Sequence, residues 1–586
     1  LMSFWVSENK VPISQTNISI PAENGINYQS GQEIHITIPE TIDFVNPMQT
    51  YLNMDVRIHN DTTYPTLINL DAETGANVLI RTARHYTADG TLISEVDNYN
   101  TWVALKYDYS TSESMRNKRA LTEGSMCRDP NIVGSNFTTK SKANSYIHTP
   151  YFEPKSDPET SPMTNASFLD AKVCLPLHFS IFGNEKIFPN GLVGGSKIVL
   201  LLEDNSRVFR QQDGALFDRR LNLNPIFHST NACSVTGALA NNGSTNTIYT
   251  YQENSQHSGA DQSPFSVGES FGIAISNGCD VQNGSKVKFT NASGDPKITR
   301  IEYQSGIVGS QTKLMKYTLS ASVKVSGSGC PTGDGVLFTT SLWNASAPAF
   351  TPTYECKNVH LVCQSVDMGQ QYKTDMMRQM KEGGVLRYDW LDQTCYKYSQ
   401  LSSDRVANIR IPINNRKAKS CLAVATDSSV YTTAQQTSGS GTYTYKPNNV
   451  DNDVFLTSNR CGITGIADNI TSYQFNLQGK LVPNRLVNCV KTSSGKSISQ
   501  QHLIELDKAL SQSGIMAHSL SEFNKNFVIG RALSLSDGVI DARNTDFNLM
   551  VNYEQATAPA KNKLWQIFIG HIRTINIRNG GVDLEV

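Results

Sequence analysis

The stretch Tyr51–His59, which reads YLNMDVRIH, alternates apolar and polar residues without a break. Its apolar members are Leu52, Met54, Val56 and Ile58. Successive side chains of a β-strand point to opposite faces, so a repeat of two predicts a strand with one buried face and one wet face. This stretch therefore predicts that the protein is built around amphipathic strands.

The same alternation recurs along the chain, and turn residues separate the repeats. Further strands are predicted at Ile34–Ile38, Val287–Phe289, Val323–Val325, Tyr473–Leu477 and Ile575–Ile577. Asn-Gly and Asp-Gly pairs, which tolerate positive φ and close tight hairpins, lie between such runs. Many short strands with frequent turn signals are typical of sandwiches and barrels, so we predict an all-β fold.

Helical patterns are sparse, and only two segments favour a helix. Asp367 is a candidate cap for a helix that carries Tyr372, Met376, Met377 and Met380 and ends at Gly383-Gly384. A second helix is predicted from about Ser499 to Gly514. Strands and helices do not alternate, which argues against doubly wound and TIM-barrel folds.

Charge and cysteine usage exclude several classes of protein. The 586 residues hold 51 Lys and Arg against 52 Asp and Glu, a net charge of −1, which is not expected of a chain whose whole surface coats nucleic acid. The longest apolar run, Ile198–Leu202, is too short to cross a bilayer as a helix. The 11 cysteines are scattered and never form Cys-x-x-Cys, so we expect reduced thiols rather than a disulfide scaffold or a zinc site.

No signature of a catalytic, cofactor-binding or metal-binding site stands out, and we predict none. Gly327–Gly335 is glycine-rich but lacks the Gly-Lys-Ser/Thr ending that binds phosphate, so a turn is expected there. Adjacent carboxylates at Glu203 with Asp204, and at Asp389 with Asp392, are candidates for an acid/base pair. A glycosidase needs its two carboxylates about 5–9 Å apart across a cleft, which sequence spacing does not establish.

Histidines and basic clusters fit a structural interpretation better than a functional one. His59, His360 and His571 fall within strand patterns, where a solvent-facing or hydrogen-bonded histidine is the common case. The basic clusters are expected to be solvated faces, although together they could form one surface for an acidic lipid or nucleic acid. They comprise Arg116–Arg119, the group Arg207, Arg210, Arg219 and Arg220, and Arg416–Lys419.

The first half contains, in this order, Leu92–Trp102, Leu175–Phe179, Phe188–Gly191, Ser196–Leu202 and Val359–Asp367. Taken in order, these segments resemble the double jelly-roll major capsid proteins of virophages, polinton-like viruses and larger nucleocytoplasmic DNA viruses. Leu92–Trp102 is similar to the family's segment that leads into a helix. Leu175–Phe179, Phe188–Gly191 and Ser196–Leu202 resemble the late strands of the first roll. Val359–Asp367 resembles the last strand of that roll, followed by a connecting helix.

The second half continues the resemblance. Ile409–Lys417 resembles the opening of the second roll, and Ser472–Pro483 is similar to an internal strand. Phe527–Leu533, Asp541–Phe547 and Ile575–Gly581 resemble the family's ending in order and spacing. Two departures from the pattern of the larger viruses, the absence of His-Pro at residues 414–416 and the ending Gly-Gly-Val-Asp-Leu, favour a virophage-like member.

The resemblance implies two tandem jelly-roll β-sandwiches with a large β-rich insertion and few short helices. It implies a first roll over residues 1–367 with a surface insertion at about 206–350, a connecting helix over 368–384, and a second roll over 385–586. The insertion is expected between the last two strands of the first roll, where it would decorate the outer surface of a capsid and interlock neighbours.

The function implied by the resemblance is that of a viral structural protein with no chemistry of its own. Three copies would form a pseudo-hexameric capsomer, through permanent interfaces that bury well over ~2,000 Å² per pair, and capsomers would build an icosahedral shell. Implied partners are further copies, penton proteins and minor capsid or cement proteins. Nucleic acid would not be bound sequence-specifically, although the inner face could contact the genome or an internal membrane weakly.

The resemblance also implies a place in the virion, after synthesis and assembly inside an infected host cell. The alternative function is a carbohydrate-binding or glycoside-hydrolysing protein of several β-sandwich domains. A trimer in solution favours the capsid protein, whereas a monomer or dimer that loses turnover on mutation of one carboxylate pair favours the hydrolase.

Overall fold

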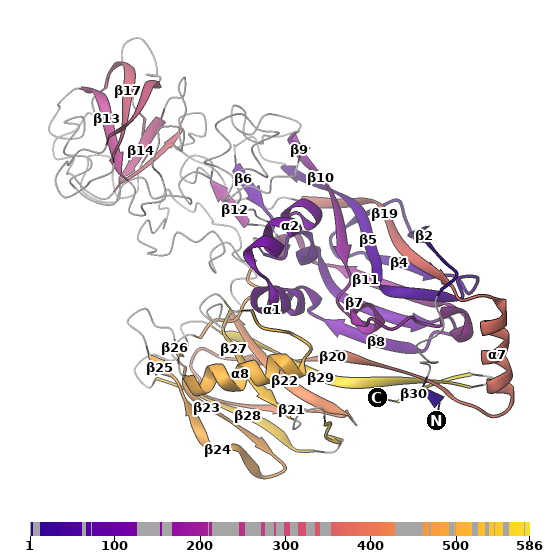
Figure 1. Ribbon diagram of the computed structural model, residues 1–586. Coiled ribbons are helices and arrows are strands. Elements are labelled where there is room, and N and C mark those ends of the chain that lie inside the picture. Colours follow the sequence, from indigo (N-terminus) through magenta and orange to yellow (C-terminus); the bar gives the residue numbers. More distant parts are fainter. Residues whose placement is uncertain are drawn as a thin grey trace.

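The computed structural model describes two β-sandwiches and parts of the segments that connect their strands (Figure 1). The described residues are 2–3, 12–60, 66–71, 73–125, 153–154, 167–208, 210–213, 245–251, 271–275, 286–288, 298–304, 314–323, 335–339, 353–415, 417–427, 461–467, 470–491, 497–498, 500–518, 526–533, 538–543, 545–554, 559, 562–578 and 581–585.

The first sandwich has eight principal strands, which we letter B to I in chain order. They are β2 (Ser14–Pro21), β4 (Glu33–Ile38), β5 (Phe44–Asn60), β7 (Ile80–Thr87), β8 (Leu92–Asp97), β10 (Ser167–Pro176), β11 (Ser196–Leu202) and β19 (Thr353–Asp367). One sheet has the order β2-β19-β5-β10, or B-I-D-G, and the other has the order β4-β11-β7-β8, or C-H-E-F. Two antiparallel sheets of eight interleaved strands make a jelly roll.

The second sandwich repeats this order strand for strand. Its strands B to I are β20 (Leu386–Gln400), β21 (Val406–Ile411), β22 (Ala418–Asp427), β23 (Ile470–Leu477), β24 (Lys480–Asn488), β27 (Val528–Ala532), β28 (Phe547–Tyr553) and β29 (Lys563–Arg578). The sheets run β20-β29-β22-β27 and β21-β28-β23-β24, again B-I-D-G and C-H-E-F. The expected all-β double jelly roll is therefore confirmed.

Short strands extend or flank these sheets. Two of them meet the second sandwich, since β1 pairs with β20 in parallel and β30 pairs with β29. Strands β12 to β18 follow β11 and precede β19, and β13, β14 and β17 lie apart from both sandwiches in Figure 1. The bounds are β1 (Met2–Ser3), β3 (Asn27–Gln29), β6 (Thr66–Asn69), β9 (Glu153–Pro154), β12 (Arg210–Asp213), β13 (Thr245–Tyr251), β14 (Phe271–Ile275), β15 (Lys286–Lys288), β16 (Ile298–Gln304), β17 (Leu314–Val323), β18 (Gly335–Thr339), β25 (Val490–Lys491), β26 (Ser497–Ile498) and β30 (Gly581–Glu585).

The helices connect strands and cover the sheets. The α-helices are α1 (Tyr99–Ser110), α2 (Glu113–Glu123), α5 (Asn205–Val208), α7 (Gln370–Lys381) and α8 (Gln500–Gln512). The 3-10 turns are η1 (Ala76–Leu79), η2 (Ser180–Gly183) and η3 (Asn190–Val193). Both α1 and α8 lie between strands F and G of their sandwich, and α7 leads from the first sandwich to the second.

The alternation in the sequence places the core as predicted. Leu52, Met54, Val56 and Ile58 of β5 are each at most 1% exposed. Tyr473 and Phe475 are buried in the same way in β23 of the second sandwich. Parts of two other predicted strands lie outside the described residues, namely Phe289, Lys324 and Val325.

The helix predicted after Asp367 exists, but its predicted cap is wrong. Asp367 is the last residue of β19, and the residue before α7 is Gly369, at φ 82° with no side-chain cap. The Asp367 carboxylate instead accepts a 2.7 Å hydrogen bond from the Gly369 backbone N–H. A positive φ suits glycine, so the chain turns there before the helix begins. The second predicted helix is α8, followed by Gly514 at φ 74°.

Candidate functional site at the junction of the two sandwiches

The first sandwich is fixed to the second by polar contacts of strand β8. Ser94 Oγ donates a 2.8 Å hydrogen bond to Asp392 Oδ1 of β20, and Lys397 Nζ lies 2.6 Å from Asp97 Oδ2. Arg573 of β29 pairs with Asp392 at 3.1 Å and donates to the backbone carbonyl of Ile93. Asp392 is 2% exposed, so this contact is formed away from water, where a charge needs a partner.

Aromatic side chains continue the same junction on either side of these polar contacts. Phe188 meets Tyr388 edge to face with ring centroids 5.3 Å apart, and the Tyr388 hydroxyl donates to the Lys186 carbonyl at 2.7 Å. The rings of Trp102 in α1 and Phe568 in β29 lie 5.6 Å apart. Such pairs stabilise beyond their buried area by about 0.5–1.5 kcal/mol.

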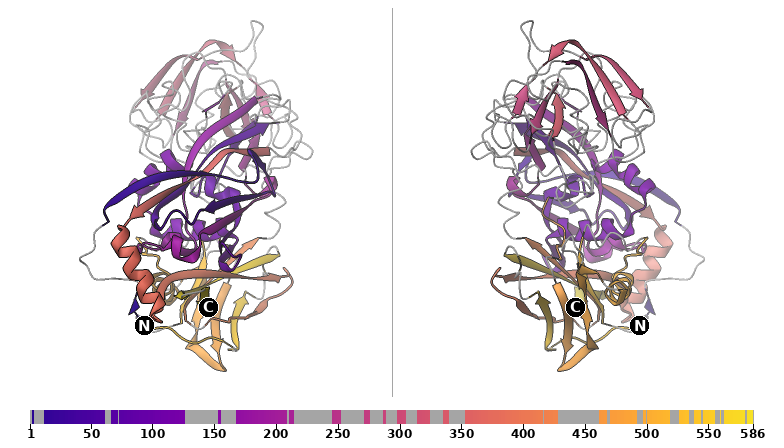
Figure 2. Two further views of the ribbon diagram at one scale, coloured as in Figure 1. Left: turned by 90° about the vertical axis from the view of Figure 1, so that its right-hand side faces the viewer. Right: turned by 90° about the vertical axis from the view of Figure 1, so that its left-hand side faces the viewer.

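The apolar core does not stop at the boundary between the sandwiches. One cluster of buried side chains includes Ile36 and Leu52 of the first sandwich together with Leu422, Val424 and Phe568 of the second. A separate cluster fills the space between the two sheets of the second sandwich. Figure 2 shows the sandwiches stacked directly against each other in both views. Because they share buried apolar surface, the two sandwiches pack as one continuous block.

Two buried residues outside the strands, Asp71 and Asn526, form further hydrogen bonds between the two halves of the chain. The Asp71 carboxylate accepts from the Thr74 backbone N–H at 2.9 Å and from the Cys461 backbone N–H at 3.0 Å. Asn526 donates to Asp108 at 2.8 Å, and its backbone carbonyl accepts the Tyr109 hydroxyl at 2.6 Å. Helix α1 is therefore bonded to the segment just before β27.

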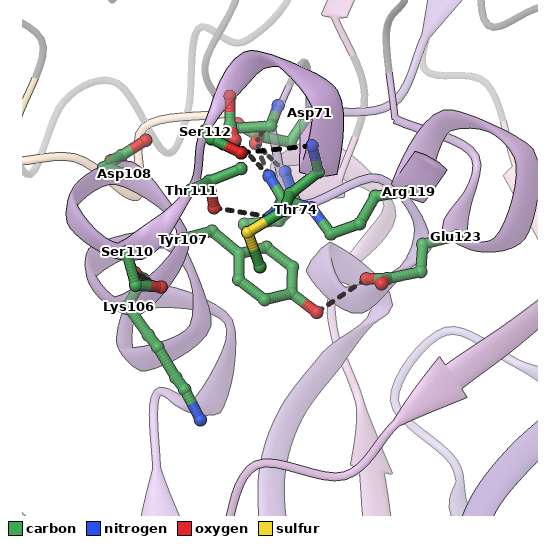
Figure 3. A network of polar contacts seen from close by, with 12 residues as sticks. Asp71, Thr74, Lys106, Tyr107, Asp108, Ser110, Thr111, Ser112, Arg119 and Glu123 are labelled. Atoms are coloured by element: carbon green, nitrogen blue, oxygen red, sulfur yellow. Dashed lines mark hydrogen bonds and ion pairs between the residues drawn. The ribbon is translucent and has the colours of Figure 1, made fainter. Parts of the chain in front are cut away.

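A buried charged network holds α1 and α2 on the first sandwich (Figure 3). Arg119 forms an ion pair with Glu73, and its guanidinium carbon lies 3.9 Å from the centre of the Tyr107 ring. The Tyr107 hydroxyl lies 2.7 Å from both Glu123 Oε2 and His178 Nε2. Burial raises the pKa of Glu123 to about 7 and lowers the pKa of His178 well below its ordinary value. The network positions the helices.

The carboxylate pairs considered in the sequence have structural partners. Glu203 is 1% exposed, and Asn100 donates to it at 3.0 Å. Asp389 accepts from Arg387 at 2.9 Å and from Thr574, whereas Asp392 serves the junction. The Glu203 contact ties helix α1 to the end of β11, and the Thr574 contact joins β20 to β29, so these carboxylates have structural partners.

The three strand histidines also take part in local contacts. His59 Nε2 lies 3.0 Å from Glu355 Oε1, and His360 Nδ1 lies 2.8 Å from the Asn358 carbonyl. His571 is buried, which lowers its pKa to about 4. The neutral ring of His571 accepts from Arg573 Nε at 3.1 Å, next to the Asp392 ion pair.

The expectation that the basic clusters are solvated faces is wrong for three side chains. Arg119 is 8% exposed and lies inside the buried network. Arg207 Nη1 lies 3.4 Å from Glu203 Oε1, with 19% of the Arg207 side chain exposed. Lys417 donates to Thr574 at 2.9 Å and is also mostly covered. Arg219, Arg220 and Arg416, like residues 327–334 of the glycine-rich segment, lie outside the described residues.

The described residues show neither a metal site nor a membrane-spanning helix. There, no group of three or more His, Cys, Asp and Glu side chains is placed to hold a metal ion. Seven cysteines in that part are free thiols: Cys174, Cys356, Cys363, Cys395, Cys421, Cys461 and Cys489. No helix among the described residues is both long enough and apolar enough for a membrane span.

No protein-family model and no curated protein sequence matches this chain. Among solved structures, the Faustovirus major capsid protein is similar, with 8% identity over 98% of this chain and 92% of that chain and a TM-score of 0.46. A structure of the Sputnik virophage matches with 9% identity over 99% and 90% and a TM-score of 0.44. The mavirus major capsid protein matches with 9% identity over 99% and 93% and a TM-score of 0.41. The strand order of the chain itself is therefore the firmer evidence for its fold.

Proposed function

We propose that this protein is the major capsid protein of a virus similar to virophages. Three copies associate into a pseudo-hexameric capsomer, and capsomers tile an icosahedral shell. The observation that carries the proposal is the repeated jelly roll: two sandwiches of identical strand order are joined through one buried core. Three such chains bring six equivalent sandwiches around one axis, which is the shape a hexagonal tile requires.

The absence of an enzymatic role is part of the proposal. The buried Glu203 carboxylate accepts a hydrogen bond from Asn100. The buried Asp392 carboxylate accepts one from Ser94 and forms an ion pair with Arg573, so both charges already stabilise the fold. A catalytic acid or base must instead be free to exchange a proton with a substrate. We infer that the chain acts through its shape and its contacts.

The proposed domain division follows the strands. The first roll covers residues 1–367, with an insertion at about 206–350 in the connection between β11 and β19, although β1 within this range pairs with β20 of the second roll. Residues 368–384 form the connecting element around α7, and residues 385–586 form the second roll, which opens with β20. The end of β19 at Asp367 and the start of β20 at Leu386 support these boundaries. We propose that the insertion lies on the outer surface of the capsid.

Further partners are proposed from the part that such a tile plays in a shell. An icosahedron needs penton proteins at its fivefold vertices, and minor capsid or cement proteins at the seams between capsomers. A net charge of −1 supports only weak contact of the inner face with a genome or an internal membrane. Synthesis and assembly would take place inside the infected cell, and the finished protein would reside in the virion.

Size-exclusion chromatography with light scattering tests the proposal. The purified chain should elute as a species of three times the 64.5 kDa of one copy, and the trimer should persist on dilution. A monomer or dimer that hydrolyses glycosides, and loses turnover when Asp389 or Glu203 is replaced, would instead support the hydrolase alternative.

A further inference from the structure

The contact between the two sandwiches of one chain uses two different surfaces. The first sandwich contributes strand F, β8, together with the residues after η2 that lead toward strand H. The second sandwich contributes strands B and I, β20 and β29. The bonds from Ser94 to Asp392 and from Arg573 to Ile93, and the ring contact of Phe188 with Tyr388, join these surfaces.

The first sandwich has its own strands B and I, and strand B is largely uncovered in this chain. Seven of the eight residues of β2 are exposed, and Ile20 alone is buried. Ile13, just before the strand, is 71% exposed, and Ile18 within it is 37% exposed. In the second sandwich, by contrast, Tyr388, Trp390 and Asp392 of strand B are each at most 3% exposed.

Strand β2 lacks the features that protect the edge of a β-sheet. It reads SQTNISIP, which contains no charged residue, and its only proline is the last residue, Pro21. Its register with β19 runs from Ser14 to Pro21 without a bulge. Edge strands of soluble proteins are normally guarded by charges, prolines or bulges, so an unguarded edge that carries exposed isoleucines indicates a surface that becomes covered.

The second sandwich also has an uncovered surface, although its strand, unlike β2, carries Lys480, Pro483 and Arg485, so only its exposed leucines mark it for docking. Its strand F, β24, lies at the edge of its sheet, and among the described strands it pairs only with β23. Leu481 is 49% exposed and Leu486 is 39% exposed, and of the nine residues in the strand only Val487 is buried. In the first sandwich the equivalent strand β8 contacts β20 through Ser94 and Asp97, and its Ile93 is 1% exposed.

We propose that β24 of one copy docks against β2 and β19 of the next copy, repeating between chains the contact that joins the two sandwiches within a chain. The occupant is a second copy because the described part of each chain carries one uncovered surface of each kind. The two surfaces differ, so the contact is head to tail, and a head-to-tail contact ends only when the ring closes. This inference rests on the proposed function and names the surfaces by which that trimer forms.

Two charge-inserting variants test the docking surfaces. Leu486→Asp and Leu481→Asp place a carboxylate on β24, and Leu401→Asp, at a residue 61% exposed between β20 and β21, is the matched control. Light scattering across a dilution series yields the dissociation constant of the trimer. The β24 variants should raise this constant on the order of 30-fold or more, and the control should leave it unchanged. Thermal unfolding of the dissociated chains should be the same for all three, which separates lost docking from lost folding.

Photo-crosslinking of the otherwise native chain identifies the partner surface. A benzoylphenylalanine in place of Leu486 should, on irradiation of the trimer, join two chains, and mass spectrometry should place the link within residues 14–21 or 353–367 of the other copy. A trimer that crosslinks from β24 to β24, or to another surface, would overturn this inference and leave the proposed capsomer intact. A chain that is monomeric without any substitution would overturn the proposed function itself.

Discussion

Ser94 in the first sandwich donates a 2.8 Å hydrogen bond to Asp392 in the second, although 298 residues separate them in the chain. Asp392 also pairs with Arg573, and all of this takes place where the carboxylate is 2% exposed. A buried charge is tolerated only with partners that compensate its lost hydration, so the bond fixes how one sandwich sits on the other. The block that the chain offers for assembly depends on this relationship.

Removing the Asp392 carboxylate should weaken the whole chain. Asp392→Ala leaves the Arg573 guanidinium without its ion pair, at a position where 11% of that side chain is exposed. We expect a loss of about 3 kcal/mol in the free energy of unfolding, measured by chemical denaturation. Asp541→Ala removes a carboxylate from an exposed pair with Arg543, and it should leave that free energy nearly unchanged because water screens the pair. Equal effects from both variants would contradict a buried junction.

Trimming the aromatic contact at the junction should destabilise both sandwiches together. Trp102 is 4% exposed and packs on Phe568, so Trp102→Ala leaves a cavity at the boundary and should cost about 3–5 kcal/mol. Hydrogen exchange read by mass spectrometry should show faster exchange in strands of both sandwiches, including β5 and β22. Faster exchange confined to the first sandwich would show that the two sandwiches unfold independently.

Acid should destabilise the fold through its buried histidines. Burial lowers the pKa of His85 to about 3 and the pKa values of His502 and His571 to about 4, against 6.5 ordinarily. The unfolded chain therefore binds more protons below pH 6.5, so stability is fully present above that pH and falls as the pH drops toward 4. The thermal midpoint of His85→Gln should be lower at pH 7 but should fall less between pH 6.5 and 4.5. A slope as steep as in the wild type would count against this account.

Glu123 should act in the opposite direction. Its pKa is raised to about 7 in the folded chain, so the unfolded chain loses this proton first as the pH rises. The folded state is favoured most below pH 4.5 and loses stability between pH 4.5 and 7. Glu123→Gln removes the titration but keeps an oxygen that can accept from Tyr107 and Asn77. The midpoint of the variant, minus that of the wild type, should rise across this range, whereas a flat difference would contradict the buried position of Glu123.

One glycine next to the second sandwich should not tolerate even a methyl group. A Cβ at Gly465 would lie 1.9 Å from the backbone oxygen of Phe527, whereas a Cβ at Gly183 would meet no atom within 4 Å. Gly465→Ala should therefore lower the free energy of unfolding by about 1–3 kcal/mol because backbone must move. Gly183→Ala is the control, and comparable losses in the two variants, measured by denaturation, would mean that this segment is packed differently.

The strands and the fold class could be predicted from the sequence because they follow local rules. The alternation of Leu52, Met54, Val56 and Ile58 needs only the geometry of one strand to be interpreted. The expectation of two rolls in tandem came from the resemblance of the ordered segments, from Leu92–Trp102 to Ile575–Gly581, to a known family. Such alternating patterns can be recognised in the sequence because each strand with one buried face needs apolar residues at every second position.

The junction could not be predicted because it joins residues that no local pattern relates. In the sequence, Asp392 is a candidate for an acid/base pair with Asp389. The structure instead shows its carboxylate in contact with Ser94 and Arg573. Arg119 belonged to an apparently solvated basic run, yet it lies buried against Glu73 and Tyr107. Each of these roles depends on tertiary contacts. The identity of a charged residue alone does not tell whether its side chain is exposed to water or paired with a buried partner.

Electron microscopy of the purified oligomer tests the central claim most directly. If the chain is a double jelly-roll capsid subunit, the images should resolve three chains whose six sandwiches stand side by side around one axis in a hexagonal outline. Single chains, or pairs related by a twofold axis with the β24 edge exposed to solvent, would contradict it.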